Sequence, residues 1–531
     1  MDNFSSIKIL IFICFYSVVL GDICGLSSIC DCDPIEDPLN VICQGDFLTI
    51  IPQDLPPYIQ NLSLKSTMIR DCDSTLGHYT QLIHLDLSDN QIFRISPSAF
   101  SRLSMLETLN LNHNYLNVLG ARNLEGLSHL LRLHLQENTL SEIHGSVFSQ
   151  GACSSLTSLD LSHNKLNHLH PNLFQNCHQL QILDLSHNHL TNIVDLPSSS
   201  LVVLKLDGNN LGGMQSNSPF RRLNKLKTLS LNDCKLHHSS HDYFDGLNEL
   251  RSLFLEDNHF LELPFVNHVK RKMYLKELTQ LKIGSNVLEK ISTELTVMPN
   301  LKYLSISGCQ NKKEFIIDPD TFKDNHHLHE LSIRSCHGLM SLPDNLLLHL
   351  PSLQSLSLRG NGLHRLSPRT ADWNALNYLD LSDTQLFCDC SLSWILETNY
   401  SEFRLLFEAS NVTCLEKEGK LSLDSLDCHM KHGSLLNSNT KYLKFIILAG
   451  VCAVILLLGA GMYLYIGKHS NERRKSIHRR RINKMDISVI TESVSNPSEY
   501  KDILYEDNDY DECSPLRGNL SNFPDVKTSV L

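Results

Sequence analysis

Two stretches of the sequence decide the fold: LTSLDLSHNKL at residues 156–166 and LQILDLSHNHL at residues 180–190. Each carries leucine at its first, fourth, sixth and eleventh positions and asparagine at its ninth. About fourteen copies of this pattern follow one another at intervals of 21 to 28 residues. Good copies begin at Leu82, Leu106, Leu130, Leu156, Leu180, Leu201, Leu226, Leu250, Leu278 and Leu353, and weaker ones at Ile59, Leu301, Leu328 and Leu376.

The repeated leucines cannot all be buried within one copy, because each copy is too short to enclose a core. Successive copies must therefore stack as coils, so that a continuous core runs through the pile. Residues around the leucine at the fourth position of each copy alternate between the core and the surface, as in a β-strand. The pattern predicts an α/β solenoid over residues 59–386, curved like a horseshoe, with a parallel β-sheet on its concave face.

The ninth position of each copy predicts a buried amide that satisfies backbone groups left unpaired by the tight turn. Cysteine replaces asparagine there at Cys234, Cys309 and Cys336. We interpret these three as buried thiols, since cysteine is small and suited to burial. A disulfide between Cys309 and Cys336 is the alternative, because they fall in successive copies. The asparagines are Asn90, Asn114, Asn138, Asn164, Asn188, Asn209, Asn258, Asn286 and Asn361.

The two ends of the chain predict a membrane topology. Residues 1–21 have an apolar run after Lys8 and small residues near the expected cleavage point, as in a secretory signal peptide. Residues 445–466 carry no charge and are long enough to cross the hydrocarbon core. Basic residues are concentrated after this span, which places the C-terminus in the cytosol. We expect a single-pass type I protein of the plasma membrane, with a linker at 431–444 and a disordered cytoplasmic tail at 467–531.

The cysteines indicate an oxidising compartment, since fourteen of the 17 lie between the signal peptide and the span. Cys153 and Cys177 stand three residues before equivalent leucines of adjacent copies, about 5 Å apart if the coils stack, so we expect a disulfide. Cys72 has no evident partner. Two clusters flank the repeats, and spacing alone allows three pairings in each. They are Cys24, Cys30, Cys32 and Cys43 in residues 22–58, and Cys388, Cys390, Cys414 and Cys428 in residues 387–430.

The repeats and both cysteine clusters, with Trp394 in the second, resemble extracellular leucine-rich-repeat proteins of animals over residues 24–428. The resemblance implies that the clusters cap the open ends of the solenoid. It also implies disulfides between Cys388 and Cys414 and between Cys390 and Cys428. With one span and a short tail, the organisation is similar to the Capricious and Tartan group of recognition proteins, or to a Toll-like receptor ectodomain without the cytosolic TIR domain.

A row of residues between the second and third leucines of each copy is expected to face the concave side. Its charge changes sign along the chain, and an aromatic residue, Phe254, follows the change. A protein ligand with complementary charges would explain the row, and an ordinary solvated strand face would also explain it. The candidate ligand contacts are Asp160, Asp184, Lys205, Phe254 and Lys282.

Enzyme chemistry is not expected. Ser162 and His163 follow Asp160, but this order comes from the repeated text and provides no base held against a nucleophile. No cofactor or metal is expected. The net charge is −12, and the basic residues gather beside the span, so a nucleic-acid partner is not expected either. Glycan acceptor motifs occur at Asn61, Asn399 and Asn411.

The tail contains three short motifs. Tyr500 and Ile503 fit an inhibitory tyrosine motif or a sorting signal, which predicts an SH2 or sorting-adaptor partner. An acidic tract surrounds Tyr505 and Tyr510, a setting in which a phosphate would add strong acceptors. The final residues, with Ser529 and the terminal Leu531, match a PDZ-domain ligand.

These features predict a cell-surface receptor or adhesion protein that binds a protein ligand outside the cell and couples to adaptors through its tail. The alternative is an innate-immune receptor or co-receptor that acts with a partner carrying the signalling domain. Small residues at Ala449 and Ala453 leave room for a homodimer within the membrane.

Overall fold

The computed structural model describes residues 30–32, 39–149, 151–193, 196–197, 200–214, 220–237, 243–265, 275–309, 314–387, 389–410 and 412–414. All of them belong to one compact unit, Met1–His429. The predicted signal peptide, linker, span and tail lie outside the described residues. Within those residues, no helix has the length and apolar character needed to cross a membrane.

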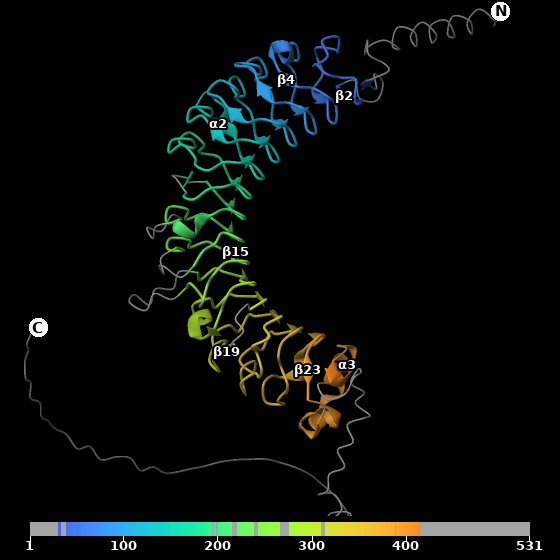
Figure 1. Ribbon diagram of the computed structural model, residues 1–531, viewed down its shortest axis with the longest axis vertical. Coiled ribbons are helices and arrows are strands. Elements are labelled where there is room, and N and C mark those ends of the chain that lie inside the picture. Colours follow the sequence, from blue (N-terminus) through green and yellow to red (C-terminus); the bar gives the residue numbers. More distant parts are fainter. Residues whose placement is uncertain are drawn as a thin grey trace, which may run out of the picture. The chain divides into compact units, whose positions relative to one another are not determined.

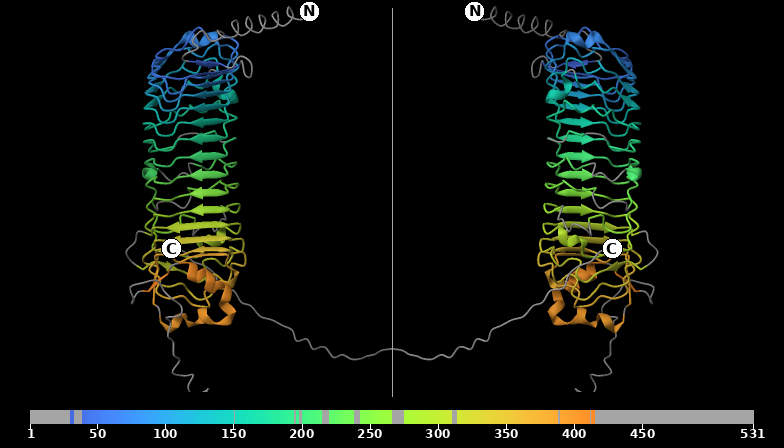
Figure 2. Two further views of the ribbon diagram at one scale, coloured as in Figure 1. Left: turned by 90° about the vertical axis from the view of Figure 1, so that its right-hand side faces the viewer. Right: turned by 90° about the vertical axis from the view of Figure 1, so that its left-hand side faces the viewer.

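The main element is a 16-stranded sheet (Figures 1 and 2). Its first two strands, β1 (Cys30–Cys32) and β2 (Asn40–Cys43), are antiparallel, and every later neighbour is parallel. Fourteen strands follow β2, one for each predicted repeat, so about thirteen turns of coil join the first to the last. They are β3 (Asn61–Ser63), β5 (His84–Asp86), β7 (Thr108–Asn110), β9 (Arg132–His134), β11 (Ser158–Asp160), β12 (Ile182–Asp184), β13 (Val203–Lys205), β14 (Thr228–Ser230), β15 (Ser252–Phe254), β16 (Gln280–Lys282), β18 (Tyr303–Ser307), β20 (Glu330–Arg334), β21 (Ser355–Ser357) and β22 (Tyr378–Asp380).

The predicted leucine-rich-repeat solenoid with a parallel sheet is confirmed, and the sheet lines the inner side of the arc formed by this unit (Figure 1). Helix is scarcer than the α/β class suggests. The described α-helices are α2 (Ala152–Ser155) and α3 (Ser401–Ala409). The outer sides of the coils are turns, short paired strands and 3-10 helices, because few residues remain between one strand and the next.

Short parallel pairs link neighbouring coils away from the main sheet. They are β4 (Asp71–Cys72) with β6 (Arg94–Ile95), β8 (Val118–Leu119) with β10 (Glu142–Ile143), β17 (Lys290–Ile291) with β19 (Ile316–Ile317), and β23 (Gln385–Leu386) with β24 (Thr413–Cys414). The 3-10 helices are η1 (Ser74–His78), η2 (Leu211–Gly213), η3 (Thr293–Val297), η4 (Trp373–Ala375), η5 (Cys390–Leu396) and η6 (Thr398–Tyr400).

The core is one continuous cluster of buried side chains through the coils. The central leucine of each strand is in register with the next, as Leu159 is with Leu183, and both are fully buried. Phenylalanines from the outer turns, such as Phe100 and Phe148, close the core opposite the sheet. Each such buried side chain contributes roughly 1.5–3 kcal/mol, and most of that is gained only when a neighbouring coil covers it.

The residue at the ninth position of each repeat, here called the ladder position, stabilises the turn that follows each strand. Asn114 shows the usual arrangement: its Nδ2 donates to the carbonyls of Leu87, Leu111 and Asn112 at 2.9–3.1 Å. Its Oδ1 accepts from the Ile92 amide of the preceding coil at 2.9 Å. One side chain therefore satisfies four buried backbone groups and joins two coils.

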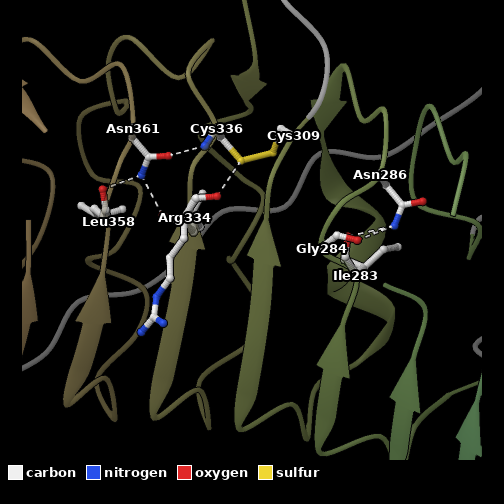
Figure 3. The surroundings of a disulfide bond; sticks show 9 residues. Ile283, Gly284, Asn286, Cys309, Arg334, Cys336, Leu358 and Asn361 are labelled. Atoms are coloured by element: carbon white, nitrogen blue, oxygen red, sulfur yellow. Dashed lines mark hydrogen bonds between the residues drawn. A yellow bond between two sulfur atoms is a disulfide. The ribbon is translucent and has the colours of Figure 1, made fainter. Parts of the chain in front are cut away.

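Two cysteines at the ladder position correct the sequence interpretation. Cys309 and Cys336 form a disulfide (Figure 3), so the thiol interpretation favoured for this pair is wrong. Stacking brings ladder positions of successive coils within one strand spacing, and the two Cα atoms are 4.6 Å apart. Cys336 Sγ lies 3.6 Å from Arg334 O. A disulfide sulfur carries no proton, so this contact is not a hydrogen bond.

Cys234 keeps a free, buried thiol, as interpreted. Its Sγ donates to the carbonyls of Leu206 at 3.2 Å and Asn232 at 3.5 Å, which partly replaces the asparagine amide. Burial raises the pKa of this thiol to about 12, so it stays protonated. Cys72 is also buried and free, and burial raises its pKa too.

Disulfides link β1 to β2 and join two coils within the repeats, and aromatic residues pack together at the C-terminal end of the described chain. Cys30 bonds to Cys43 across β1 and β2, and Cys153 bonds to Cys177 between adjacent coils. At the other end Trp373 packs 4.9 Å and Trp394 5.4 Å from the Phe403 ring of α3, measured between ring centroids. Cys390 is disulfide-bonded. Cys24, Cys388 and Cys428 lie outside the described residues, as do the side chains of Cys32 and Cys414.

Candidate inner-face binding site

The five candidate ligand contacts lie in one row across six consecutive strands, β11 to β16. The register aligns Asp160, Asp184, Lys205, Ser230, Phe254 and Lys282. Each follows a buried leucine, so its side chain leaves the core on the inner face. Neighbouring strands are about 4.8 Å apart, so the row extends roughly 24 Å along the sheet.

The row changes from acidic to basic between Asp184 and Lys205, and these two residues form an ion pair. Lys205 Nζ lies 3.0 Å from Asp184 Oδ2, and only 13% of the Asp184 side chain is exposed. The hydrogen bond with Asp184 raises the pKa of Lys205. The two charges therefore neutralise each other, and they are less available to a ligand than the sequence row suggests.

Phe254 and Lys282 form the next unit of the row. Lys282 Nζ lies 5.7 Å from the centroid of the Phe254 ring, within cation–π range. The ring is half-buried rather than fully exposed, because Ser230 and Lys282 flank it on adjacent strands. Beside it, burial raises the pKa of Glu256, and Lys282 opposes that effect. The result is an aromatic surface beneath a cation in the middle of the sheet.

The polar residues at the start of the row hold local structure. Asp160 Oδ1 accepts from the backbone amide and hydroxyl of Ser162 at 3.0 and 2.7 Å. The His163 and His187 rings stack with centroids 4.3 Å apart. The serine hydroxyl therefore bonds to the carboxylate rather than to the histidine. Within the described chain, no group of three or more His, Cys, Asp or Glu residues could hold a metal ion.

Two exposed tyrosines on the inner face were missed by the sequence analysis. Tyr303 on β18 and Tyr378 on β22 are 47% and 50% exposed. They precede the central leucine of their strands, whereas the candidate row follows it. Reading both flanks of each central leucine would have found them. Together with Phe254 they place three aromatic rings on the inner face between β15 and β22.

The glycan acceptor motifs differ in position. Asn61 is partly exposed in β3, at the first repeat of the inner sheet. Asn399 is exposed in η6, near the last coil, where its carbonyl accepts from Asn374. Asn411 and the tail residues Tyr500, Ile503, Tyr505, Tyr510, Ser529 and Leu531 lie outside the described residues.

The chain is similar to known leucine-rich-repeat proteins. A leucine rich repeat family model matches residues 57–116, 80–140, 104–150, 128–190 and 199–260. Tsukushi of Gallus gallus is 31% identical over 325 residues, covering 61% of this chain and 73% of that protein. The transforming growth factor beta activator LRRC33 of Danio rerio is 27% identical over 375 residues, covering 65% of this chain and 50% of the relative.

A solved structure agrees with the fold. A leucine-rich-repeat protein of Leptospira interrogans superposes with a TM-score of 0.53 at 26% identity, covering 66% of this chain and 83% of that one. The coils, their register and the similarity to Tsukushi lead to one conclusion. The chain belongs to the leucine-rich-repeat family that includes Tsukushi.

Proposed function

We propose that the chain is a cell-surface leucine-rich-repeat receptor or adhesion protein that binds a protein ligand on its inner sheet. The contact is centred on Phe254 and Lys282. One observation carries the proposal: an aromatic ring capped by a cation lies mid-sheet, with Tyr303 and Tyr378 exposed on the same face. Aromatic and cationic anchors of this kind account for much of the binding energy in protein interfaces.

The ligand class follows from the shape and chemistry of this face. The row is a broad, shallow sheet surface with few uncompensated charges, which suits a folded protein better than a small molecule. The zebrafish relative is named as an activator of transforming growth factor beta. We therefore take secreted signalling proteins as the first ligand class to test, and transforming growth factor beta as the first probe.

The membrane part of the proposal rests on sequence. The apolar run at 445–466 and the basic residues after it support a type I topology. The tail motifs at Tyr500, Tyr505 and Leu531 support coupling to SH2, sorting or PDZ adaptors. An antibody against the tail should stain permeabilised cells only. Staining of intact cells would overturn this topology.

The binding proposal is tested on the full chain displayed on cells. Transforming growth factor beta is titrated first, and a panel of purified secreted and surface proteins follows. Phe254→Ala should weaken binding of the ligand found by about 30-fold, the loss of a typical hot spot of roughly 2 kcal/mol. Leu405→Ala is the matched control, since this residue is 69% exposed on α3, which lies beside the last strand β22 rather than beside β15.

Two results would overturn the proposal. One is equal binding of the ligand by wild type and Phe254→Ala, or equal weakening by Phe254→Ala and Leu405→Ala. The other is binding of added microbial products with no binding of any protein in the panel, which would favour an innate-immune receptor.

A further inference from the structure

A second row of exposed and half-buried residues runs along the edge where the inner strands begin. Each member is the second residue of its repeat and directly precedes a strand. The backbone amide of each donates to the carbonyl of the member before it. These bonds join Arg251 to Lys227, Thr279 to Arg251, Lys302 to Thr279 and His329 to Lys302 at 2.8–2.9 Å. The side chains therefore follow one line across β14, β15, β16, β18 and β20.

The chemistry of this line changes halfway along the solenoid. In the earlier coils the same position holds no cation, and its one charged member is Glu107. The remaining earlier members are Gln60, Ile83, Leu131, Thr157, Gln181 and Val202. From Lys227 onward three of four successive members are cations: Lys227, Arg251 and Lys302, here called the basic row. All three are exposed.

The basic row differs from the other cations of the inner face. Those cations have partners within the protein: Lys205 pairs with Asp184, Lys282 lies over Phe254, and Arg359 pairs with Asp383 at 2.9 Å. Further examples are Lys65 with Asp89, Arg132 with Thr108 and Arg334 with Ser357.

In the part of the chain that the structure describes, the side chains of the three residues of the basic row form no ion pair and no hydrogen bond. Acidic groups are nearby but do not pair with them. Glu249 and Glu277 are exposed two residues before Arg251 and Thr279, and Glu330 is exposed on β20. The cations of the basic row are thus left for an external anion.

We propose that the basic row binds a linear sulfated polysaccharide lying along the solenoid, across the strands. The cations are spaced along that direction by the strand repeat, about 4.8 Å per coil, so an extended polyanion meets them in turn. Because the three cations are exposed and unpaired, they favour polyelectrolyte attraction with release of counterions over one buried ion pair.

The disulfides indicate an oxidising compartment, where long polyanions are sulfated polysaccharides rather than nucleic acids. This surface does not include Phe254, so the proposal stands apart from the protein-binding proposal above.

The test uses the full chain and heparin as the probe, with de-N-sulfated heparin for comparison. The variant Lys227→Gln, Arg251→Gln, Lys302→Gln removes the basic row. The matched control, Lys165→Gln, Lys290→Gln, Lys323→Gln, removes the same charge from exposed lysines outside it. We expect the first triple variant to bind heparin at least about tenfold more weakly at physiological salt, with a shallower salt dependence. The control triple variant should bind like wild type, and all three should unfold at the same temperature.

Three outcomes would overturn the proposal. The first is equal weakening by both triple variants, which would show general charge attraction. The second is undiminished heparin binding by the first variant. The third is retention on immobilised polyglutamate without retention on heparin, which would assign the row to an acidic protein segment. Binding of transforming growth factor beta is measured in parallel, and loss of heparin binding with that binding intact separates the two proposals.

Discussion

The two halves of the solenoid hold their coils with different chemistry at the same position. From residue 90 to residue 209, six successive ladder positions are asparagine. From residue 234 to residue 384 the ladder reads Cys, Asn, Asn, Cys, Cys, Asn and Thr. In the second half, β18 and β20 pair over five residues, whereas the other parallel pairs of the inner sheet are over three. A covalent link and longer strand pairing therefore replace amide hydrogen bonds where two asparagines are lost.

The largest effect is expected in the asparagine half. Asn188 donates to the carbonyls of Leu161, Leu185 and Ser186 and accepts from the Leu166 amide, at 3.0–3.2 Å. Asn188→Leu leaves these buried groups unpaired, so we expect a loss of about 4 kcal/mol of unfolding free energy. Urea unfolding followed by circular dichroism measures it. The neighbouring exposed His189→Gln should change stability by less than about 0.5 kcal/mol, and equal effects would refute the ladder argument.

Removal of the covalent link in the second half should have the next largest effect. Cys309→Ser with Cys336→Ser opens a 27-residue loop, so we expect a loss of about 3 kcal/mol in urea unfolding under oxidising conditions. Cys153→Ser with Cys177→Ser opens a 24-residue loop and should cost a similar amount. If the first pair costs less than about 0.5 kcal/mol, the disulfide does not compensate for the missing amides.

A substitution at Cys234 sharpens the comparison, because Cys234→Asn should not raise the stability of the protein. In this coil the Leu211 amide donates to the Cys234 carbonyl at 3.0 Å, rather than to a ladder side chain. The Oδ1 of Cys234→Asn would thus be buried without a donor, and we expect a loss of about 1 kcal/mol in the same unfolding assay. An increase in stability would show that the two halves differ only by the absence of an amide.

The smallest expected effect is a pH dependence in the first half. Burial lowers the pKa of His134 on β9. The unfolded chain, whose histidine pKa is about 6.5, therefore binds more protons than the folded chain below that pH. The free energy of unfolding should therefore rise as the pH increases from the lowered pKa of folded His134 to about 6.5, and fall as the pH drops through the same range. His134→Gln should remove this part of the slope, whereas the exposed His327→Gln should not; an unchanged slope in the first variant would contradict the assignment.

Much of the fold could be predicted from the sequence, because the leucine spacing fixes which residues enter the core. The strands after β2 occur where copies were counted, including the weak ones at Ile59 and Leu376. The sequence favours free thiols at Cys309 and Cys336, although the stacking argument that pairs Cys153 with Cys177 applies to them equally. Burial of a small thiol is common, and that general preference outweighed the geometry.

The sequence predicted which residues of the candidate site lie in one row, but not which of their side chains contact each other. Sequence position placed Asp160 to Lys282 along one line, and the register agrees. It could not show that Asp184 and Lys205 neutralise each other, because that depends on side-chain conformations on neighbouring strands. The candidate row follows the central leucine of each strand, so it also did not reveal Tyr303 or the basic row, which lie before that leucine.

Disulfide mapping tests the stacking register most directly. The intact, non-reduced chain is alkylated, digested and analysed by mass spectrometry. The account predicts one linked peptide pair joining Cys309 to Cys336 and another joining Cys153 to Cys177, with Cys72 and Cys234 recovered as protected thiols that alkylate only after unfolding. Recovery of Cys309 and Cys336 as free thiols, or bonded to other cysteines, would contradict it.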